Sequence, residues 1–302
     1  MPITLRRYHR LDVYFCRTIN ILENQRSVTA KDIFNCLCQL GVVEGDTIFV
    51  HSQIFSIGEI KGGTSSSTIC NIIYSSFRKA VGLTGTIVVP TFTTNIARSG
   101  GVFDLDKSPS DTGILTEYIR LLTGSYRSIH PINSVSANGP NAETICENLA
   151  STNYGAETAF DRMLSLDVKV INFGFSSRWS NSFHHHAETV LGLPYLYNKL
   201  LNITTKVNGI IYQSPMFASL RYLDFEVSND LTAFDQYLVK NDLIKIERLG
   251  RSWLSLIPGR LYYDEAIKKL KNDPWYFLAA PPRFRLGEIP YDGAPDLNLK
   301  TN

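Results

Sequence analysis

Three short, mostly apolar runs are the most regular feature of the hydrophobic pattern. They occupy residues 46–50 (DTIFV), 85–90 (GTIVVP) and 168–175 (VKVINFGF). Runs of this length without strict alternation are typical of strands that are buried on both faces. Between the first two runs, residues 66–81 place apolar side chains at helical spacing. The order strand, helix, strand predicts a crossover unit, and therefore an α/β fold with a largely parallel central sheet flanked by helices.

A helix is predicted just before the first strand. Thr29 and Asp32 have the spacing of a capping box, and the apolar stripe that follows stops at Gly41. Further helices are predicted within residues 111–122, 141–149 and 158–166, and a long loop, which in a compact domain is usually functional, over 91–110.

The last third of the chain has a different pattern. Asn208 and Gly209 separate two short runs, 202–207 and 210–213, which is a strong hairpin signal. With further strands at 216–225, 243–248 and 252–257, it predicts an antiparallel lobe over about residues 200–258. Two helices are expected at 232–240 and 262–271. We divide the chain into an N-terminal strap (1–28), one domain (29–278) and a surface or disordered tail (279–302).

Composition narrows the class of protein. The chain has 302 residues, 44% of them hydrophobic, and a net charge of +2 from scattered basic residues. This composition is that of a globular protein and gives no sign of nucleic-acid binding. No apolar run approaches the roughly 20 residues that cross a bilayer, and the first residues lack the features of a signal peptide, so we expect a cytoplasmic protein. The five cysteines are odd in number and are expected to be reduced. A homo-oligomer is compatible with the sequence.

The densest group of chemical side chains is the stretch Ser182-Phe183-His184-His185-His186-Ala187-Glu188. On a helix, His184 and His185 precede Glu188 by four and three residues, so both can lie on its face, whereas His186 points elsewhere. A carboxylate that fixes the tautomer of an imidazole is what a general base requires. A metal site and a surface turn decorated with histidines are the alternatives that the residues leave open.

Candidate polar residues follow the ends of all three predicted strands. His51 ends the first, Thr91 follows the second, and the histidine stretch comes soon after the third. In open α/β sheets, ligands gather outside the carboxyl ends of the strands. We therefore expect these residues to line one site.

Five motifs in the same order give the chain a resemblance to the antibiotic N-acetyltransferase family, whose best-known members are the aminoglycoside 3-N-acetyltransferases. The resemblance runs from about residue 29 to residue 278. The motifs are 45–52 (GDTIFVHS) with Ile57-Gly58 and Gly62-Gly63, 85–93 (GTIVVPTFT), Ser108-Pro109-Ser110 with Gly113 and Glu117, 127–131 (RSIHP) with Ser134, Ala137 and Gly139, and 182–188 (SFHHHAE). In the last motif, the family usually has a threonine and two apolar residues before His-x-Ala-Glu.

The resemblance implies an enzyme that transfers acetyl from acetyl-coenzyme A directly to an amine, with no metal and no acyl-enzyme. It makes His185 the general base and Glu188 its neighbouring acid. His184 stands where the family has an aliphatic residue, so the base could be either of the two histidines. The family also uses an acid from the region after the hairpin to orient the histidine, for which Asp224 or Glu226 is the nearest match.

The resemblance also implies a set of coenzyme-binding residues. Strand-end capping by Ser and Thr, and a structural role for a lone histidine, are the competing readings of several of them. The predicted residues are Ser52, Gln53, Ile54, Gly58, Thr91, Thr112, Gly113, Arg127, Ser128 and His130.

The sequence leaves two classes of acceptor amine open. Aminoglycosides are polycations and call for an acidic pocket. Residues 193–240 instead carry four basic and four acidic side chains. An amino sugar linked to a nucleotide, of the kind used in surface polysaccharide synthesis, is therefore the second candidate. A non-catalytic coenzyme A or sugar sensor, and a metal-dependent hydrolase using His184, His185 and His186, are the alternative functions.

Overall fold

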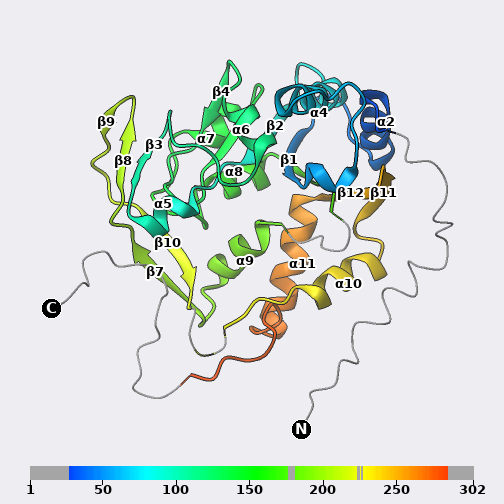
Figure 1. Cartoon of the computed structure of the whole chain (residues 1–302). Helices are drawn as coiled ribbons and strands as arrows, with labels where there is room; N and C mark the ends of the chain where they lie inside the picture. The colour runs from blue at the N-terminus through cyan, green and yellow to red at the C-terminus, as the bar shows by residue number, and fades with distance from the viewer. Residues whose placement is uncertain (1–26, 176–180, 223–224, 226, 285–302) are drawn as a thin grey trace, which may run out of the picture.

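A seven-stranded sheet forms the centre of the computed structural model, which describes residues 27–175, 181–222, 225 and 227–284 (Figure 1). The strand order is β11-β12-β6-β1-β2-β5-β4. The three central strands are parallel, and the two strands on either side of them pair antiparallel. The strands are β1 (Thr47–Ser52), β2 (Thr86–Pro90), β4 (Ser125–Arg127), β5 (Val135–Asn138), β6 (Lys169–Phe173), β11 (Lys245–Leu249) and β12 (Ser252–Pro258).

Helices cover both faces of this sheet. Side chains of β1 alternate between two apolar cores: Phe49 packs with one face, and Ile48 and Val50 pack with the other. Both faces are therefore buried, as the apolar runs predicted. The helices are α2 (Ala30–Leu40), α3 (Ile54–Ile57), α4 (Ser66–Val81), α5 (Thr94–Ser99), α6 (Ile114–Arg120), α7 (Ala142–Cys146), α8 (Ala159–Ser165), α9 (Phe183–Leu191), α10 (Thr232–Lys240) and α11 (Gly259–Asn272).

Two smaller sheets lie beside the main one. One pairs β7 (Leu196–Leu200) with β10 (Phe217–Arg221), and the other has the order β3-β8-β9. Its strands are β3 (Val102–Asp104), β8 (Thr204–Val207) and β9 (Ile210–Ile211). The turn Asn208-Gly209 joins β8 to β9, which confirms the predicted hairpin, and both residues have the positive φ angles that such a turn requires.

The α/β class with helices on both faces is confirmed, but the parallel part is confined to three strands. No sequence pattern marks β4 and β5, because they are three and four residues long and carry no apolar run. The predicted lobe over about residues 200–258 also differs from the observed sheets, since β11 and β12 join the main sheet. The reason is visible in β12, where Leu254 and Leu256 face one core and Ile257 the other. A strand with apolar residues on both faces is stable only inside a sheet that is covered on both sides.

The predicted loop over residues 91–110 contains α5 and β3, which were not expected. Helices α4 and α10 have the predicted bounds. None of the described helices is long and apolar enough to pass through a membrane. The predicted strap lies almost entirely outside the described residues, as do residues 285–302 of the tail, and the division into strap, domain and tail stays a prediction.

The capping box predicted for α2 is present and gives a test of local stability. The Thr29 side chain accepts a hydrogen bond from the Asp32 backbone N–H at 3.1 Å, and the Asp32 carboxylate accepts one from the Thr29 N–H at 2.9 Å. Thr29→Ala should lower the free energy of unfolding by about 1 kcal/mol, measured by urea denaturation. Ser66→Ala, at an exposed position of α4, is the control and should stay within about 0.5 kcal/mol of the parent. Equal effects of the two changes would contradict the capping role.

Candidate active site

Helix α9 carries the histidines, and its position is fixed by its first residue, Phe183. Phe183 is fully buried and packs edge-to-face on Phe49 of β1 and Phe160 of α8, with ring centroids 6.0 and 5.6 Å apart. The helix ends at Gly192, which takes the left-handed conformation favoured by glycine. Strand β1 and helix α8 therefore set the direction in which the following histidines point.

His185 and Glu188 form the predicted pair. The Nδ1 atom of His185 lies 2.8 Å from Oε2 of Glu188, and the hydroxyl of Tyr195 donates to Oε1 of the same carboxylate at 2.8 Å. The side chain of Glu188 is fully buried, whereas 31% of the His185 side chain is exposed. The result is a chain of three groups that leads from the core to an accessible imidazole.

The charge of Glu188 fixes the tautomer of His185. Burial by itself raises the pKa of Glu188, but hydrogen bonds from His185 and Tyr195 and the nearby imidazoles outweigh it and hold that pKa below its ordinary value. The group is thus a carboxylate that accepts the Nδ1–H of His185. The Nε2 atom of the neutral ring then carries a lone pair.

The two neighbouring histidines have other environments. The Nδ1 atom of His184 lies 2.5 Å from the carbonyl oxygen of Asn181, and burial lowers the pKa of His184 to about 3. His186 points away from this site, as predicted: its Nδ1 accepts a hydrogen bond from the Gly155 N–H, and its ring lies 5.4 Å from that of Tyr263 on α11. His185, rather than His184, is the histidine that the carboxylate orients.

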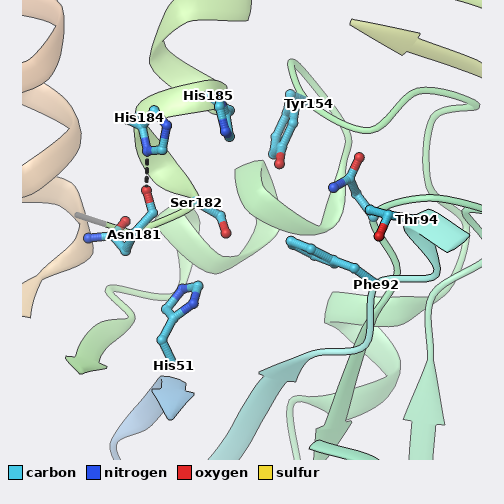
Figure 2. A pocket seen from close by; sticks show the side chains of 9 residues that line it. His51, Phe92, Thr94, Tyr154, Asn181, Ser182, His184 and His185 are labelled. Carbon is cyan, nitrogen blue, oxygen red and sulfur yellow. Dashed lines mark hydrogen bonds between the residues drawn. The ribbon is translucent and has the colours of Figure 1, made fainter. Parts of the chain in front are cut away.

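A pocket of about 380 Å³ opens beside these rings (Figure 2). It lies beyond the carboxyl ends of the three parallel strands, as the strand-end pattern predicted: His51 is the last but one residue of β1, Phe92 follows β2 and α9 follows β6. Thr91, the residue predicted after β2, is not among the lining residues. Figure 2 shows the ring of His51 across from Asn181 and Ser182, with Phe92 and Tyr154 on another side. The described residues that line it are His51, Phe92, Thr94, Asn133, Tyr154, Asn181, Ser182, His184 and His185.

Most of these lining residues were not predicted from the sequence. Asn133, Tyr154 and Asn181 stand in connecting segments, where no periodic pattern marks them. Tyr195 was also missed as a partner of Glu188, because it lies beyond the end of α9 and returns to the carboxylate only through the fold. The only signal that could have identified Tyr195 as a partner of Glu188 was its place, as an aromatic residue with a hydroxyl, shortly after the histidine stretch.

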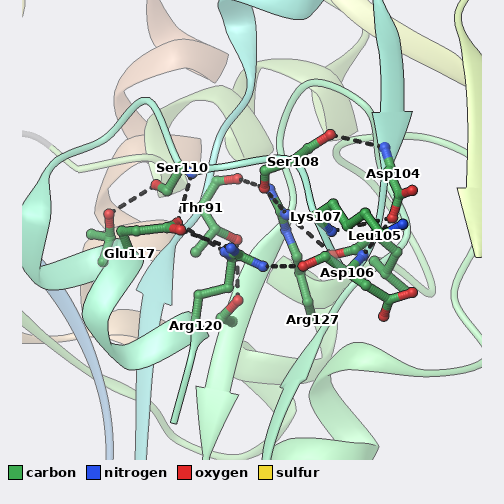
Figure 3. Close-up of polar contacts among 12 residues, drawn as sticks. Thr91, Asp104, Leu105, Asp106, Lys107, Ser108, Ser110, Glu117, Arg120 and Arg127 are labelled. Atoms are coloured by element: carbon green, nitrogen blue, oxygen red, sulfur yellow. Dashed lines mark hydrogen bonds and ion pairs between the residues drawn. The ribbon is translucent and has the colours of Figure 1, made fainter. Parts of the chain in front are cut away.

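Arg127 lies in a buried network rather than on the wall of this pocket (Figure 3). Its guanidinium donates to the carbonyl oxygens of Thr91 and Ser108 at 2.9 and 2.5 Å, and to the Ser134 hydroxyl at 3.1 Å. Burial, with the charge of Arg120 nearby, lowers the pKa of Arg127 to about 10. These bonds tie the segment after β2 to the edge of the sheet.

His130 is engaged in a similar way. Its Nδ1 accepts hydrogen bonds from the backbone N–H groups of Ile132 and Asn133, at 3.2 and 3.0 Å. The proton is therefore on Nε2, which donates to the carbonyl oxygen of Phe217 at 2.9 Å. Both ring nitrogens are used inside the protein, and burial lowers the pKa of His130 to about 4.

The other residues predicted for the coenzyme lie around the same strand ends. The Thr112 hydroxyl donates to the Pro90 carbonyl at 2.5 Å, and the Ser128 hydroxyl accepts from the Val135 N–H at 2.9 Å. None of the ten predicted residues is among those that line the pocket, and their coenzyme-binding role stays a prediction. The remaining ones are Ser52 at the end of β1, Gln53 and Ile54 at the start of α3, Gly58 after α3, Thr91 after β2, and Gly113 before α6.

The acid predicted from the region after the hairpin cannot be placed here. Asp224 and Glu226 lie outside the described residues. Within the described chain, Glu188 itself occupies the orienting position on His185.

A metal site fits the donor set poorly. His184, His185 and Glu188 each offer a potential ligand atom, and these atoms lie within 4.8 Å of one another. However, both oxygens of Glu188 already accept hydrogen bonds, one from His185 and one from Tyr195. The carboxylate is therefore engaged in orienting His185, which leaves the two Nε2 atoms as the unprotonated nitrogens of the group.

Comparisons with known proteins identify a family. A family model described as aminoglycoside 3-N-acetyltransferase matches residues 49–271. Aminoglycoside N(3)-acetyltransferase IV of a Salmonella species is 26% identical over 254 residues, which cover 83% of this chain and 90% of that protein.

Solved structures of two acetyltransferases share the fold. The apoenzyme of aminoglycoside acetyltransferase AAC(3)-IVa is 24% identical with a TM-score of 0.68, over 85% of this chain and 94% of that one. AAC-IIIb, solved as a binary complex with CoASH, is 18% identical with a TM-score of 0.69, over 85% of this chain and 100% of that one.

Proposed function

Because the chain belongs to the aminoglycoside 3-N-acetyltransferase family, we propose that it transfers the acetyl group of acetyl-coenzyme A directly to an amine of an amino sugar, with His185 as general base. The observation that carries the proposal is the hydrogen bond from His185 Nδ1 to the buried Glu188, beside a pocket. It leaves the Nε2 lone pair as the basic atom on an accessible ring.

The carboxylate supports the base in two ways. It holds the imidazole in the tautomer with Nε2 unprotonated, and it stabilises the positive charge that the ring acquires when it takes a proton. An amine attacks only when its nitrogen has a free lone pair, so removal of a proton as the new bond forms lowers the barrier. The hydrogen bond from Tyr195 keeps Glu188 in place while this happens.

Acetyl-coenzyme A, when bound, supplies an activated acetyl group as a thioester. Negative charge develops on its carbonyl oxygen during the attack, and a hydrogen-bond donor would stabilise that charge. Asn181 accepts a hydrogen bond from the Phe183 N–H through Oδ1, which directs its Nδ2 the other way. That buried Nδ2 finds no partner among the described residues, and Figure 2 shows it pointing away from Phe92 and Tyr154. The residue of the pocket wall that fits the reaction is His185, whose partly exposed imidazole can take up the proton of the amine.

Two acceptor classes are retained. The family favours an aminoglycoside. The described residues that line the pocket include no aspartate or glutamate, which favours an acceptor that is not a polycation, such as a nucleotide-linked amino sugar.

The test is release of coenzyme A from acetyl-coenzyme A with three acceptors: apramycin, glucosamine and UDP-glucosamine. We expect turnover with at least one of them, and a higher kcat/KM for UDP-glucosamine than for apramycin if the neutral lining decides the choice. Turnover of apramycin alone would remove the nucleotide-sugar candidate. Failure of all three, with coenzyme A still bound, would favour the non-catalytic alternative.

A further inference from the structure

Beside His185, the pocket is lined by His184, whose imidazole has a lone pair that the proposed mechanism does not use. Since the Asn181 carbonyl can only accept, the Nδ1 of His184 carries the proton, and its Nε2 is an acceptor. That Nε2 is buried and has no hydrogen-bond partner among the described residues. His184 as a whole residue is only 8% exposed.

An unpaired buried acceptor is costly. Leaving such a group without a donor costs about 1–3 kcal/mol, so native structures rarely keep one unless a ligand or water fills it. Because His184 lines the pocket, a molecule bound there can supply the donor. The lone pair accepts only N–H or O–H groups.

His184 and His185 act on the same space. Their ring centroids are 3.8 Å apart, and both residues line the same pocket. Figure 2 shows the two rings side by side at one end of it. Each ring carries its proton on Nδ1, bonded to the protein, so each presents an unprotonated Nε2.

We propose that His184 is a positioning residue that accepts a hydrogen bond from the second N–H of the acceptor amine, so that the site selects primary amines. This inference rests on the proposed function, in which His185 takes the first proton. A primary amine has two N–H groups, one for each imidazole. A secondary amine has one, and its carbon substituent would lie against the lone pair of His184.

The reaction balances with this assignment. The amine nitrogen forms a bond to the acetyl carbon and gives one proton to Nε2 of His185, the carbon–sulfur bond breaks, and the sulfur leaves and receives that proton as a thiol. The other N–H remains in the amide product. It can therefore donate to His184 throughout, which holds the nitrogen lone pair toward the acetyl carbon.

Two substitutions separate the two sides of the His184 ring. His184→Asn places an amide near the Nδ1 position, where it can still donate to Asn181, but lacks an acceptor at the Nε2 position. His184→Gln reaches the Nε2 position with an acceptor oxygen. His186→Asn, on the same helix but facing Phe160 and Tyr263, is the matched control.

The experiment compares kcat/KM for glucosamine with that for N-methylglucosamine in each variant. This ratio cancels differences in the fraction of folded enzyme. We expect His184→Asn to lower the ratio by about 10-fold, the worth of one buried hydrogen bond, and His184→Gln and His186→Asn to keep it within about 2-fold of the parent. An unchanged ratio in His184→Asn would overturn the inference and leave the proposed function intact.

A spectroscopic measurement covers the case in which neither sugar is acetylated, which would count against the proposed function. In protein labelled with ¹⁵N-histidine, saturation with glucosamine should shift the His184 Nε2 resonance of the parent. It should leave the Nε2 resonance of His186 unchanged. A His184 resonance that does not move would overturn the inference by itself.

Discussion

Replacing His185 by glutamine is expected to lower kcat by about 10²- to 10⁴-fold, the usual contribution of a general base. Glutamine keeps the size and polarity of the side chain but cannot take up a proton. Since the substitution leaves the walls of the pocket in place, the binding affinity for acetyl-coenzyme A should change by only a few-fold. The measurement is thiol release under saturating coenzyme, together with calorimetric titration of acetyl-coenzyme A.

Two further variants make the result specific. His186→Gln, which changes a neighbouring histidine that faces away from the pocket, should keep kcat near the parent value. Tyr195→Phe removes the hydrogen bond to Oε1 of Glu188 and should lower kcat by less than His185→Gln does, because the carboxylate remains. A His185→Gln variant as fast as the parent would refute the base, and a biological effect without turnover would support a sensor.

The stability of the protein is expected to fall steeply as the pH drops from about 6.5 to 4. Burial lowers the pKa of His51, His130 and His186 to about 4, and that of His184 to about 3. These pKa values lie below the ordinary 6.5 because burial disfavours the charged ring, so the folded protein holds each ring neutral. Between pH 6.5 and 4 the unfolded chain therefore binds protons that the native state does not, so stability rises with pH in this window and is fully present above it.

The size of this effect can be measured one histidine at a time. Each histidine that is protonated in the unfolded chain but neutral in the native protein adds a slope of up to about 1.4 kcal/mol per pH unit to the free energy of unfolding. Urea denaturation between pH 7 and 5 should show a combined slope from several of them. His130→Gln should be less stable at pH 7, because the ring bonds two backbone N–H groups and one carbonyl, yet show a shallower slope by about one proton. An equally steep slope in that variant would show that His130 is not a buried neutral group.

The sequence predicted those parts of the fold that local patterns control. Thr29 and Gly41 mark the ends of α2 because capping depends on a few neighbouring residues, and the apolar runs identify β1, β2 and β6 because burial on both faces favours apolar residues at successive positions. The contact between His185 and Glu188 was predictable for the same reason, since helical spacing alone brings the two together.

What the sequence did not predict depends on distant contacts. Tyr195 reaches Glu188 only because the chain turns back after Gly192, and Tyr154 enters the pocket from the segment before α8. The side chains of His130 and Arg127 are polar and were predicted to bind the coenzyme, but the fold surrounds them with backbone groups whose positions the residue spacing does not reveal. A structural polar residue can be distinguished from a ligand-binding one only when its hydrogen-bond partners in the fold are known.

One consequence follows from the way β10 is held against the rest of the protein. His130 bonds the carbonyl of Phe217, and Asn153 bonds both backbone groups of Ser219, at 2.8 and 3.2 Å. Swinging this strand outward would break all three bonds at once. We therefore expect the backbone of this strand to stay in place when ligands bind, and association rates to follow diffusion and orientation rather than an outward movement of β10.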